Sequence, residues 1–300
     1  MRSLDRRILA GPPPPQQPLA QPSEPRQPSE PRQPLAPIAA SRGEGLAGAE
    51  AVDWGPRLRR ALDRDLLVLH FQPIVSLADG QLHHHEALVR LDDGDPRGPL
   101  APGAFLPFAE RTGIVREIDA HVIEKTLALL GSDKAARDAL GAVAVNISAL
   151  SASDPGLLER IRGGLARHRV APSRLLVELT ETAAVTDMRA ARALCAGMLE
   201  LGCGVALDDF GAGYGSFGYL KQLPFSHLKI DGEFVRGIAS SRTDRLVVEA
   251  LVGVSRGLGR RTIAEFVQDH ESATLLRALG VDYAQGYGIG RPRALAAICC

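Results

Sequence analysis

The residues that could do chemistry are acids, amides and a lysine at or near the ends of short apolar runs. In chain order they are Glu86, Asn146, Glu178, Asp208 with Asp209, Lys229 with Asp231, Glu265 and Gln285. Burial in a core explains the apolar runs, but it does not explain polar residues repeated at their ends. In an α/β barrel the carboxyl ends of the strands meet on one face, where active sites draw residues from several strands. The sequence therefore predicts one pocket built from residues scattered between positions 86 and 285.

The acids of this set indicate a divalent metal site. Carboxylates that share a pocket repel one another unless a cation lies among them, and oxygen ligands favour Mg²⁺ or Mn²⁺ over zinc. The adjacent pair Asp208 and Asp209 could give one carboxylate to each of two ions. Two such ions, about 3.5–4 Å apart, activate a water and stabilise the leaving oxygen in phosphodiester hydrolysis. Lys229 and Arg90 would then balance phosphate charge or orient the nucleophile.

Simpler roles exist for single members of the pattern. An acid at a strand end is often the N-cap of the next helix, as Glu181 or Asp187 could be, and a lone Asn146 would be an ordinary turn residue. Recurrence on six or more runs favours a shared site over these readings. The run His83–His85 is interpreted as packed or solvated histidines in preference to a metal site.

Strand-like runs alternate with helical patterns along most of the chain. The predicted strands are 66–72, 83–90, 142–147, 175–180, 204–208, 227–231, 261–265 and 282–286. The predicted helices are 54–64, 102–111, 117–131, 155–168, 188–201, 242–258 and 269–279, with Asp154 as the N-cap before Pro155. About eight repeats of this alternation indicate a closed barrel or a doubly wound sheet, and closure is preferred. Only Ser76–Leu82, with Asp79-Gly80, separates the first two strands, so a hairpin is expected and one strand should run against the others.

The first 50 residues differ in composition from the rest. They hold 11 of the 21 prolines, contain no Phe, Trp or Tyr, and repeat QPSEPR at 21–26 and 27–32. Such a segment buries too little apolar surface to offset its ordering entropy, so residues 1–50 are expected to be a disordered Pro-rich linker. Residues 51–300 are then expected to form one barrel domain.

Charge and hydropathy exclude several classes of partner. The 35 basic and 35 acidic residues balance, which argues against a nucleic-acid polymer or an anionic membrane as partner. The run Ile8-Leu9-Ala10 is too short for a signal peptide, and no segment approaches about 20 apolar residues. The four cysteines lack zinc-type spacing, so a cytoplasmic protein with free thiols is expected.

Eight segments, in order, resemble the motifs of the EAL domain family of cyclic di-GMP phosphodiesterases. They are FQPIV (71–75), EALVR (86–90), VNIS (145–148), ELTE (178–181), DDFGAGY (208–214), LKID (228–231), AEFV (264–267) and QGY (285–287). The resemblance runs from about Leu58 to Pro292. It implies a modified TIM (β/α)8 barrel with one antiparallel strand, which hydrolyses cyclic di-GMP to linear pGpG with two Mg²⁺ or Mn²⁺ ions.

The resemblance also implies a role for each residue. Glu86, Asn146, Glu178 and Asp208 are similar to the ligands of the first ion, and Asp208, Asp209 and Glu265 to those of the second. The implied catalytic residues are Lys229, which would contact the attacking water, and Glu265, Glu181 and Gln285. Gln72, Leu88, Arg90 and Asp231 are expected to contact the nucleotide. Glu181 resembles the acid that steadies the loop from Phe210 to Ser216, which in the family couples the active site to dimerisation, so a homodimer is expected.

Three positions depart from the family pattern. The chain reads Glu265-Phe266-Val267-Gln268 where the family usually reads Glu-Gly-Val-Glu, and Gly215 stands where Ser is common. These changes are expected to lower activity or make it depend on a regulatory protein partner or on dimerisation. The main alternative is a degenerate domain that binds cyclic di-GMP or a protein without turnover. Every implied metal ligand is present, which favours the enzyme; a barrel acting on another phosphate ester ranks third.

Overall fold

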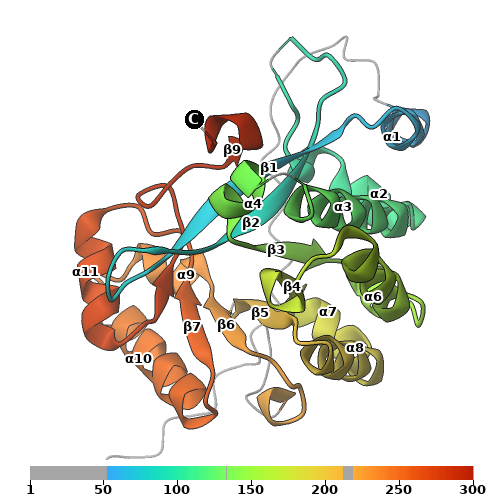
Figure 1. Ribbon diagram of the computed structural model, residues 1–300. Coiled ribbons are helices and arrows are strands. Elements are labelled where there is room, and N and C mark those ends of the chain that lie inside the picture. Colours follow the sequence, from blue (N-terminus) through green and yellow to red (C-terminus); the bar gives the residue numbers. More distant parts are fainter. Residues whose placement is uncertain (1–52, 97, 133, 212–218, 300) are drawn as a thin grey trace, which may run out of the picture. The chain divides into compact units, whose positions relative to one another are not determined.

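A closed β-barrel lies at the centre of the protein, with helices packed around its outside (Figure 1). The computed structural model describes residues 53–96, 98–132, 134–211 and 219–299. The strands are β1 (Leu67–Ser76), β2 (Leu82–Leu91), β3 (Ala142–Ile147), β4 (Leu175–Thr180), β5 (Gly204–Phe210), β6 (His227–Ile230), β7 (Arg261–Ala264), β8 (Tyr283–Ala284) and β9 (Arg293–Ala294). They are ordered β2-β3-β4-β5-β6-β7-β8-β1-β9, and a further pairing of β2 with β1 closes the ring.

β1 is the strand that runs against the others. It pairs antiparallel with β2, where Gln72 lies opposite Glu86, and antiparallel with β8 through Val75 and Ala284. Each neighbouring pair from β2 to β8 is parallel. Gly80 takes a φ of 73° in the β1–β2 turn, a conformation that glycine adopts without steric cost. The predicted hairpin and the modified barrel with one antiparallel strand are confirmed.

The helices are amphipathic and cover the barrel strands. They are α1 (Trp54–Asp63), α2 (Leu106–Thr112), α3 (Val115–Leu130), α4 (Lys134–Leu140), α5 (Ala149–Ala152), α6 (Leu157–His168), α7 (Glu181–Thr186), α8 (Met188–Glu200), α9 (Gly232–Arg236), α10 (Arg242–Gly257) and α11 (His270–Leu279), with 3-10 turns at 102–104, 172–174, 219–221 and 295–297. In α10, Val248, Leu251, Val252 and Ser255 are buried at helical spacing, as expected for one face against a core.

Polar side chains cap the starts of several of these helices. Thr180 accepts a hydrogen bond from the Ala183 amide at the start of α7, and Asp187 accepts one from Ala190 at the start of α8. These caps satisfy amides that lack partners inside the helix. The N-cap role foreseen for Asp187 is therefore present. The predicted N-cap at Asp154 is wrong: α6 begins at Leu157, two residues later than predicted, and its N-cap is Gly156, because Asp154 accepts from the Gly156 amide in a turn before the helix.

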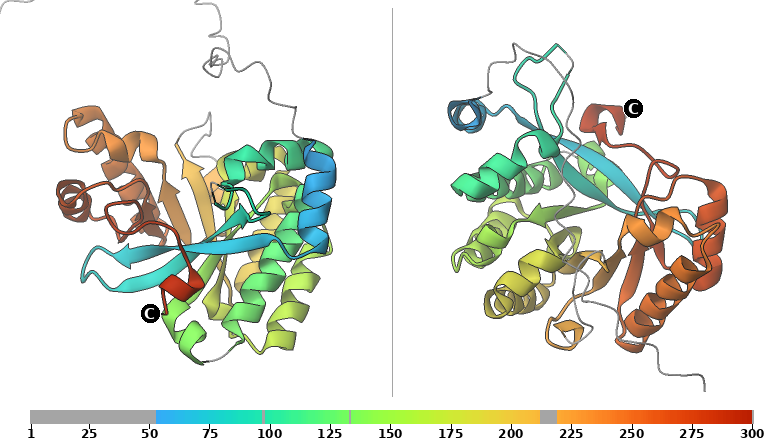
Figure 2. Two further views of the ribbon diagram at one scale, coloured as in Figure 1. Left: turned by 90° about the horizontal axis from the view of Figure 1, so that it is seen from above. Right: turned by 180° about the vertical axis from the view of Figure 1, so that it is seen from behind.

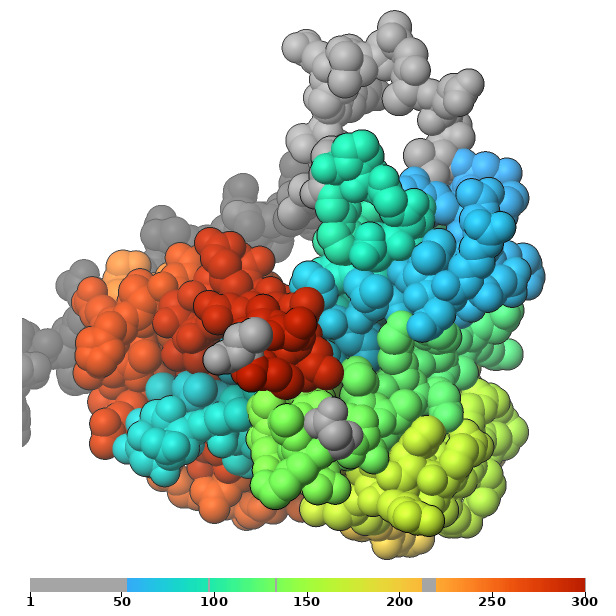
Figure 3. All heavy atoms as spheres, turned by 45° about the horizontal axis from the view of Figure 1, so that its top comes forward, coloured from blue at the N-terminus to red at the C-terminus, as the bar shows by residue number. Residues whose placement is uncertain are grey.

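The last described segment returns to the first strand. β9 pairs antiparallel with β1 at His70–Ala294 and Phe71–Arg293, and the red C-terminal segment lies beside the cyan hairpin strands (Figures 2 and 3). The hydrophobic core includes Phe71, Val145 and Leu228, and the strand register puts all three on the same side of the sheet, opposite to Glu86 and Glu178. In the described ranges no helix has the length and apolar character needed to cross a bilayer. The linker predicted for residues 1–50 lies outside the described residues.

Candidate active site

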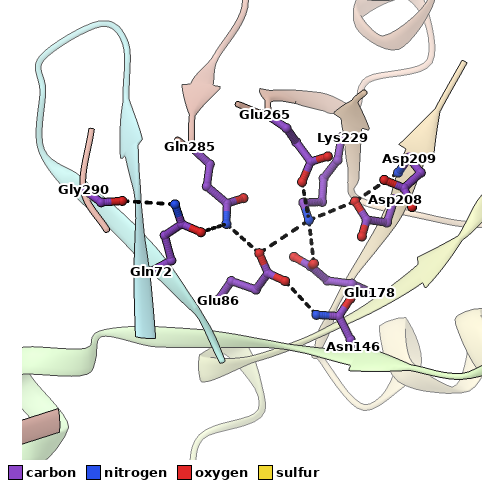
Figure 4. A network of polar contacts seen from close by, with 10 residues as sticks. All are labelled: Gln72, Glu86, Asn146, Glu178, Asp208, Asp209, Lys229, Glu265, Gln285 and Gly290. Carbon is purple, nitrogen blue, oxygen red and sulfur yellow. Dashed lines mark hydrogen bonds and ion pairs between the residues drawn. The ribbon is translucent and has the colours of Figure 1, made fainter. Parts of the chain in front are cut away.

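Eight of the nine polar residues first singled out in the sequence, all except Asp231, lie together at the carboxyl end of the barrel (Figure 4). Glu86 comes from β2, Asn146 from β3, Glu178 from β4, Asp208 and Asp209 from β5, Lys229 from β6, Glu265 from the residue after β7 and Gln285 from the residue after β8. Unlike the other residues, Glu86 lies in the middle of its strand. β2 continues for five residues beyond it. A long first hairpin thus brings a mid-strand acid level with the strand ends of its neighbours.

Lys229 is at the centre of this cluster and is almost fully buried, with 1% of its surface exposed. Its Nζ atom lies 2.7 Å from Oε2 of Glu178, 2.9 Å from Oδ1 of Asp208 and 2.8 Å from Oε1 of Glu265. Oε2 of Glu86 lies 3.7 Å away. A buried ammonium needs this surrounding negative charge, because desolvation of an unpaired ion is costly.

Two amides extend the cluster toward β1. Asn146 Nδ2 donates to Oε1 of Glu86 over 2.6 Å, and Gln285 Nε2 donates to Oε2 of Glu86 over 2.5 Å. The same Gln285 nitrogen lies 3.2 Å from Oε1 of Gln72, whose own amide donates to the Gly290 carbonyl at 3.0 Å. These bonds fix the rotamers of both glutamines and hold the Glu86 carboxylate in one orientation.

Burial shifts the pKa values of several cluster residues. Burial, followed by repulsion from Glu86 and Asp208, raises the pKa of Glu178 well above its usual value against the attraction of Lys229. Burial raises the pKa of Glu265 to about 8, and burial together with the Asp208 charge raises that of Asp209 to about 6. Burial alone would lower the pKa of Lys229, but the surrounding carboxylates raise it well above its ordinary value. Lys229 is therefore a cation at neutral pH.

The donor atoms of the cluster fit divalent metal ions. Ligand oxygens of Asp208, Asp209 and Glu265 lie within 4.8 Å of one another. Oε1 of Glu178 and Oε1 of Gln285 are buried without a hydrogen-bond partner, so oxygen lone pairs remain available beside the cluster. Five carboxylates face a single ammonium, and all the donors are oxygen, as Mg²⁺ and Mn²⁺ prefer. A backbone φ of 54° at Asp209, unusual for a residue other than glycine, turns this second carboxylate out of the strand.

Comparison with known proteins identifies the family. The sequence pattern of the family described as "EAL domain" matches residues 56–292, most of the chain. The chain belongs to the EAL domain family.

Named relatives of this EAL domain include cyclic di-GMP enzymes. The bifunctional diguanylate cyclase/cyclic di-GMP phosphodiesterase MucR of Pseudomonas aeruginosa is 38% identical over 235 residues, which cover 78% of this chain and 34% of MucR. The cyclic di-GMP phosphodiesterase PdeB of Shewanella oneidensis is 35% identical over 252 residues, covering 83% of this chain and 29% of PdeB. The chain thus spans about a third of the length of these relatives.

Solved structures of this family are similar to this chain in fold. The MucR phosphodiesterase structure, described as a complex with c-di-GMP, superposes with a TM-score of 0.76 at 36% identity and covers 82% of this chain and 100% of its own. The FimX EAL domain of Pseudomonas aeruginosa bound to c-di-GMP superposes with a TM-score of 0.74 at 29% identity, covering 81% and 98%.

Most of the acidic cluster, apart from Glu178 and Asn146, forms the floor of a cavity of about 750 Å³ in this EAL domain. The predicted nucleotide contacts Gln72, Leu88 and Arg90 line it. So do residues that the sequence did not single out as ligand contacts, namely Arg236, Phe266, Gln268, Gly286, Tyr287 and Pro292. Tyr287 could have been found from its place in the QGY motif. Arg236 lies one turn into α9 and had no signal in the sequence, because only the fold brings α9 beside the end of β7.

A second cavity of about 540 Å³ adjoins the first. Leu88 lines both cavities, and the second is otherwise mainly apolar, with Asp119, Asn146 and Ser148 among its polar lining residues. Asp119 is buried and accepts a hydrogen bond from the Ser148 amide, and burial raises its pKa. The sequence did not point to Asp119, since it lies inside α3 and away from any strand end.

Two predicted site residues belong neither to the cluster around Lys229 nor to the lining of a cavity. Asp231 accepts a hydrogen bond from the Glu233 amide and is the N-cap of α9; it does not line either cavity. Glu181 is buried, and its Oε2 accepts a hydrogen bond from the Gly211 amide at 3.2 Å, just after β5. That contact lies at the start of the loop from Phe210 to Ser216. Residues 212–216 of the loop, with Gly215, lie outside the described residues, and so does Cys300.

Proposed function

We propose that this EAL domain hydrolyses cyclic di-GMP to linear pGpG with two Mg²⁺ or Mn²⁺ ions. The observation that carries the proposal is the complete set of implied metal ligands around a buried lysine on the floor of a cavity. Glu86, Asn146, Glu178 and Asp208 would hold one ion, and Asp208, Asp209 and Glu265 the other. The relatives named above support cyclic di-GMP as the substrate.

The metal ions would activate water and offset charge on the phosphate. Lys229, whose Nζ atom lies among the proposed ligands Glu178, Asp208 and Glu265, would donate hydrogen bonds to the attacking water or a phosphate oxygen. Water adds at one phosphorus and the P–O3′ bond breaks, which leaves a 5′-phosphate and a free 3′-hydroxyl. Gln285 would keep Glu86 in its ligating orientation through the hydrogen bond between them.

The substrate contacts follow from the walls of the cavity. Arg90 is half-buried beside Leu88 and would pair with a phosphate, since a guanidinium binds phosphate oxygens through two donors. Gln72 would contact the nucleotide from β1. Asp231, as the cap of α9, would act only indirectly, by positioning that helix. The adjoining cavity beyond Leu88 offers room for the second half of a molecule that contains two nucleotides.

The wider setting belongs to the same proposal. A cytoplasmic protein would meet this bacterial messenger directly. A homodimer formed through the loop after β5, which Glu181 anchors at Gly211, would couple assembly to the active site. A regulatory protein partner could act through the same loop.

The test uses the 300-residue chain, incubated with cyclic di-GMP and Mg²⁺ or Mn²⁺, with the nucleotides separated by chromatography. We expect metal-dependent pGpG, and a loss of at least 100-fold in rate in Glu86→Ala, which removes a metal ligand. Glu249→Ala, an exposed acid on α10, is the matched control and should keep full activity. Turnover that survives both Glu86→Ala and removal of metal would refute the metal assignment.

The second candidate is a receptor that binds cyclic di-GMP without turnover. Phe266 and Gln268, which line the cavity in place of the usual glycine and glutamate, favour it. Tight binding of intact cyclic di-GMP, with no pGpG at any metal concentration, would select this candidate over the enzyme.

A further inference from the structure

Two exposed aromatic rings lie at the acidic cavity. Six large apolar side chains are exposed in the described part of the chain: Leu82, Val185, Leu246, Leu258, Phe266 and Tyr287. Phe266, at 48% exposure, and Tyr287, at 61%, are the aromatic members, and both line the cavity above the carboxylates. Exposed aromatic surface costs free energy in water, so its position beside a polar floor points to a ligand with a flat apolar part.

The backbone at Phe266 is strained. Its φ is 53°, in the left-handed region, where a bulky side chain other than Asn or Asp is an outlier. Glycine takes this conformation without that cost, which explains physically why glycine would suit position 266. Neither the left-handed backbone nor the exposed part of the ring stabilises the fold. Such strain is typically retained at ligand sites.

The surroundings of Phe266 hold the ring in place. The Arg236 guanidinium lies over one face, with Cζ 4.2 Å from the ring centroid. The ring packs against Gly232, where any side chain would overlap it. Its bulk does not displace the neighbouring acid, because Glu265 keeps its 2.8 Å contact with Lys229. A cation thus covers one face of the ring, while 48% of the residue remains exposed at the cavity.

We propose that Phe266 is the platform on which a purine base of the substrate stacks, with Arg236 as the residue that positions its ring. This inference rests on the proposed function, since the phosphate of the same nucleotide would lie at the acidic floor. Aromatic side chains bind bases in this way because each base presents a π face, and an arginine over the far face adds cation–π attraction. Phe266 would then set substrate affinity, in contrast to the loss of activity expected from the sequence.

The first measurement separates binding from the chemical step. Phe266→Leu keeps the apolar bulk and the strained backbone but removes the flat face, and Phe266→Tyr keeps the face. For cyclic di-GMP we expect Phe266→Leu to raise KM about tenfold or more with kcat within about twofold, and Phe266→Tyr to resemble the parent. An unchanged KM in Phe266→Leu, or a kcat that rises in Phe266→Gly without a change in KM, would overturn the proposal.

The second measurement does not depend on turnover. The chain has one tryptophan, Trp54, on α1, so Phe266→Trp adds one reporter indole at the cavity. We expect GMP to quench its emission and ribose 5-phosphate, which lacks a base, not to do so. Leu258→Trp, at an exposed position that lines neither cavity, is the control and should not respond.

The two measurements have distinguishable failures. A parent chain without hydrolysis, together with quenching of the Phe266→Trp variant by GMP, would refute the proposed function and support the platform. Hydrolysis without such quenching, at GMP concentrations where calorimetry detects binding, would support the function and refute the platform.

Discussion

At the scale of single residues, Lys229 is a buried cation held by several carboxylates. Three carboxylates lie within 2.9 Å of its Nζ atom, which is out of contact with solvent. The type and position of this lysine could be predicted from the sequence, because it follows a short apolar run. Its pairing with Glu178 and Glu265 could not be predicted, since those acids are 51 and 36 positions away and only barrel closure brings them together.

Lys229→Met tests how far this ammonium neutralises the cluster. The substitution keeps most of the volume but leaves buried carboxylates without their cation, which should lower the free energy of unfolding by about 3–5 kcal/mol in metal-free buffer at pH 8. Urea unfolding with a chelator present measures this change. Lys134→Met is the control, because its pair with Asp138 is exposed to solvent and should contribute little to stability. A loss for Lys229→Met no larger than that of the control would contradict the assigned role.

At the scale of elements, the sequence located nearly every barrel strand and most of the long helices. Strong apolar runs such as 142–147 and 175–180 match β3 and β4 residue for residue. The elements that were missed or misplaced lie where the hydrophobic pattern of the sequence is weak. β8 has only two residues, 283–284, because tertiary pairing with β1 and β7 and not its own composition defines it. α4, over 134–140, was missed because only Ala136 and Leu140 are buried.

Glu181 links two of these elements, and its role can be tested at that scale. Its carboxylate comes from the first turn of α7 and binds the Gly211 amide after β5, so it holds the end of one strand against the helix after another. Glu181→Ala should leave that amide without its partner, at a cost of about 1–3 kcal/mol, and increase its hydrogen exchange. Glu181→Gln retains an acceptor oxygen and should give a smaller change. Equal protection of Gly211 in all three proteins would contradict the link.

At the scale of the whole molecule, the cluster draws on seven strands or the residues that directly follow them, so its ionisation is coupled to global folding. Glu265 has a pKa of about 8 in the fold and an ordinary value near 4.5 when unfolded. A raised pKa means that the protonated acid is favoured in the fold. The Glu265 carboxyl therefore contributes its full stabilisation of the fold below pH 4.5, and this stabilisation is lost as the pH rises toward 8. Asp209, with a pKa of about 6, loses its smaller contribution at lower pH.

A divalent ion should reverse this trend, because it binds the ionised carboxylates and competes with their protons. Between pH 6 and pH 8 the metal-free chain should lose about 2 kcal/mol through Glu265, whereas Mg²⁺ or Mn²⁺ should stabilise the fold more at pH 8 than at pH 6. Calorimetric melting with either ion and with a chelator, at both pH values, measures the difference, expected as several degrees in Tm. Glu265→Gln removes the titrating group and should make the increment in Tm less dependent on pH. If the metal increment were equal at both pH values, or larger at pH 6, then the buried carboxylates would not be the metal ligands, because ligation by ionised Glu265 requires the opposite sign.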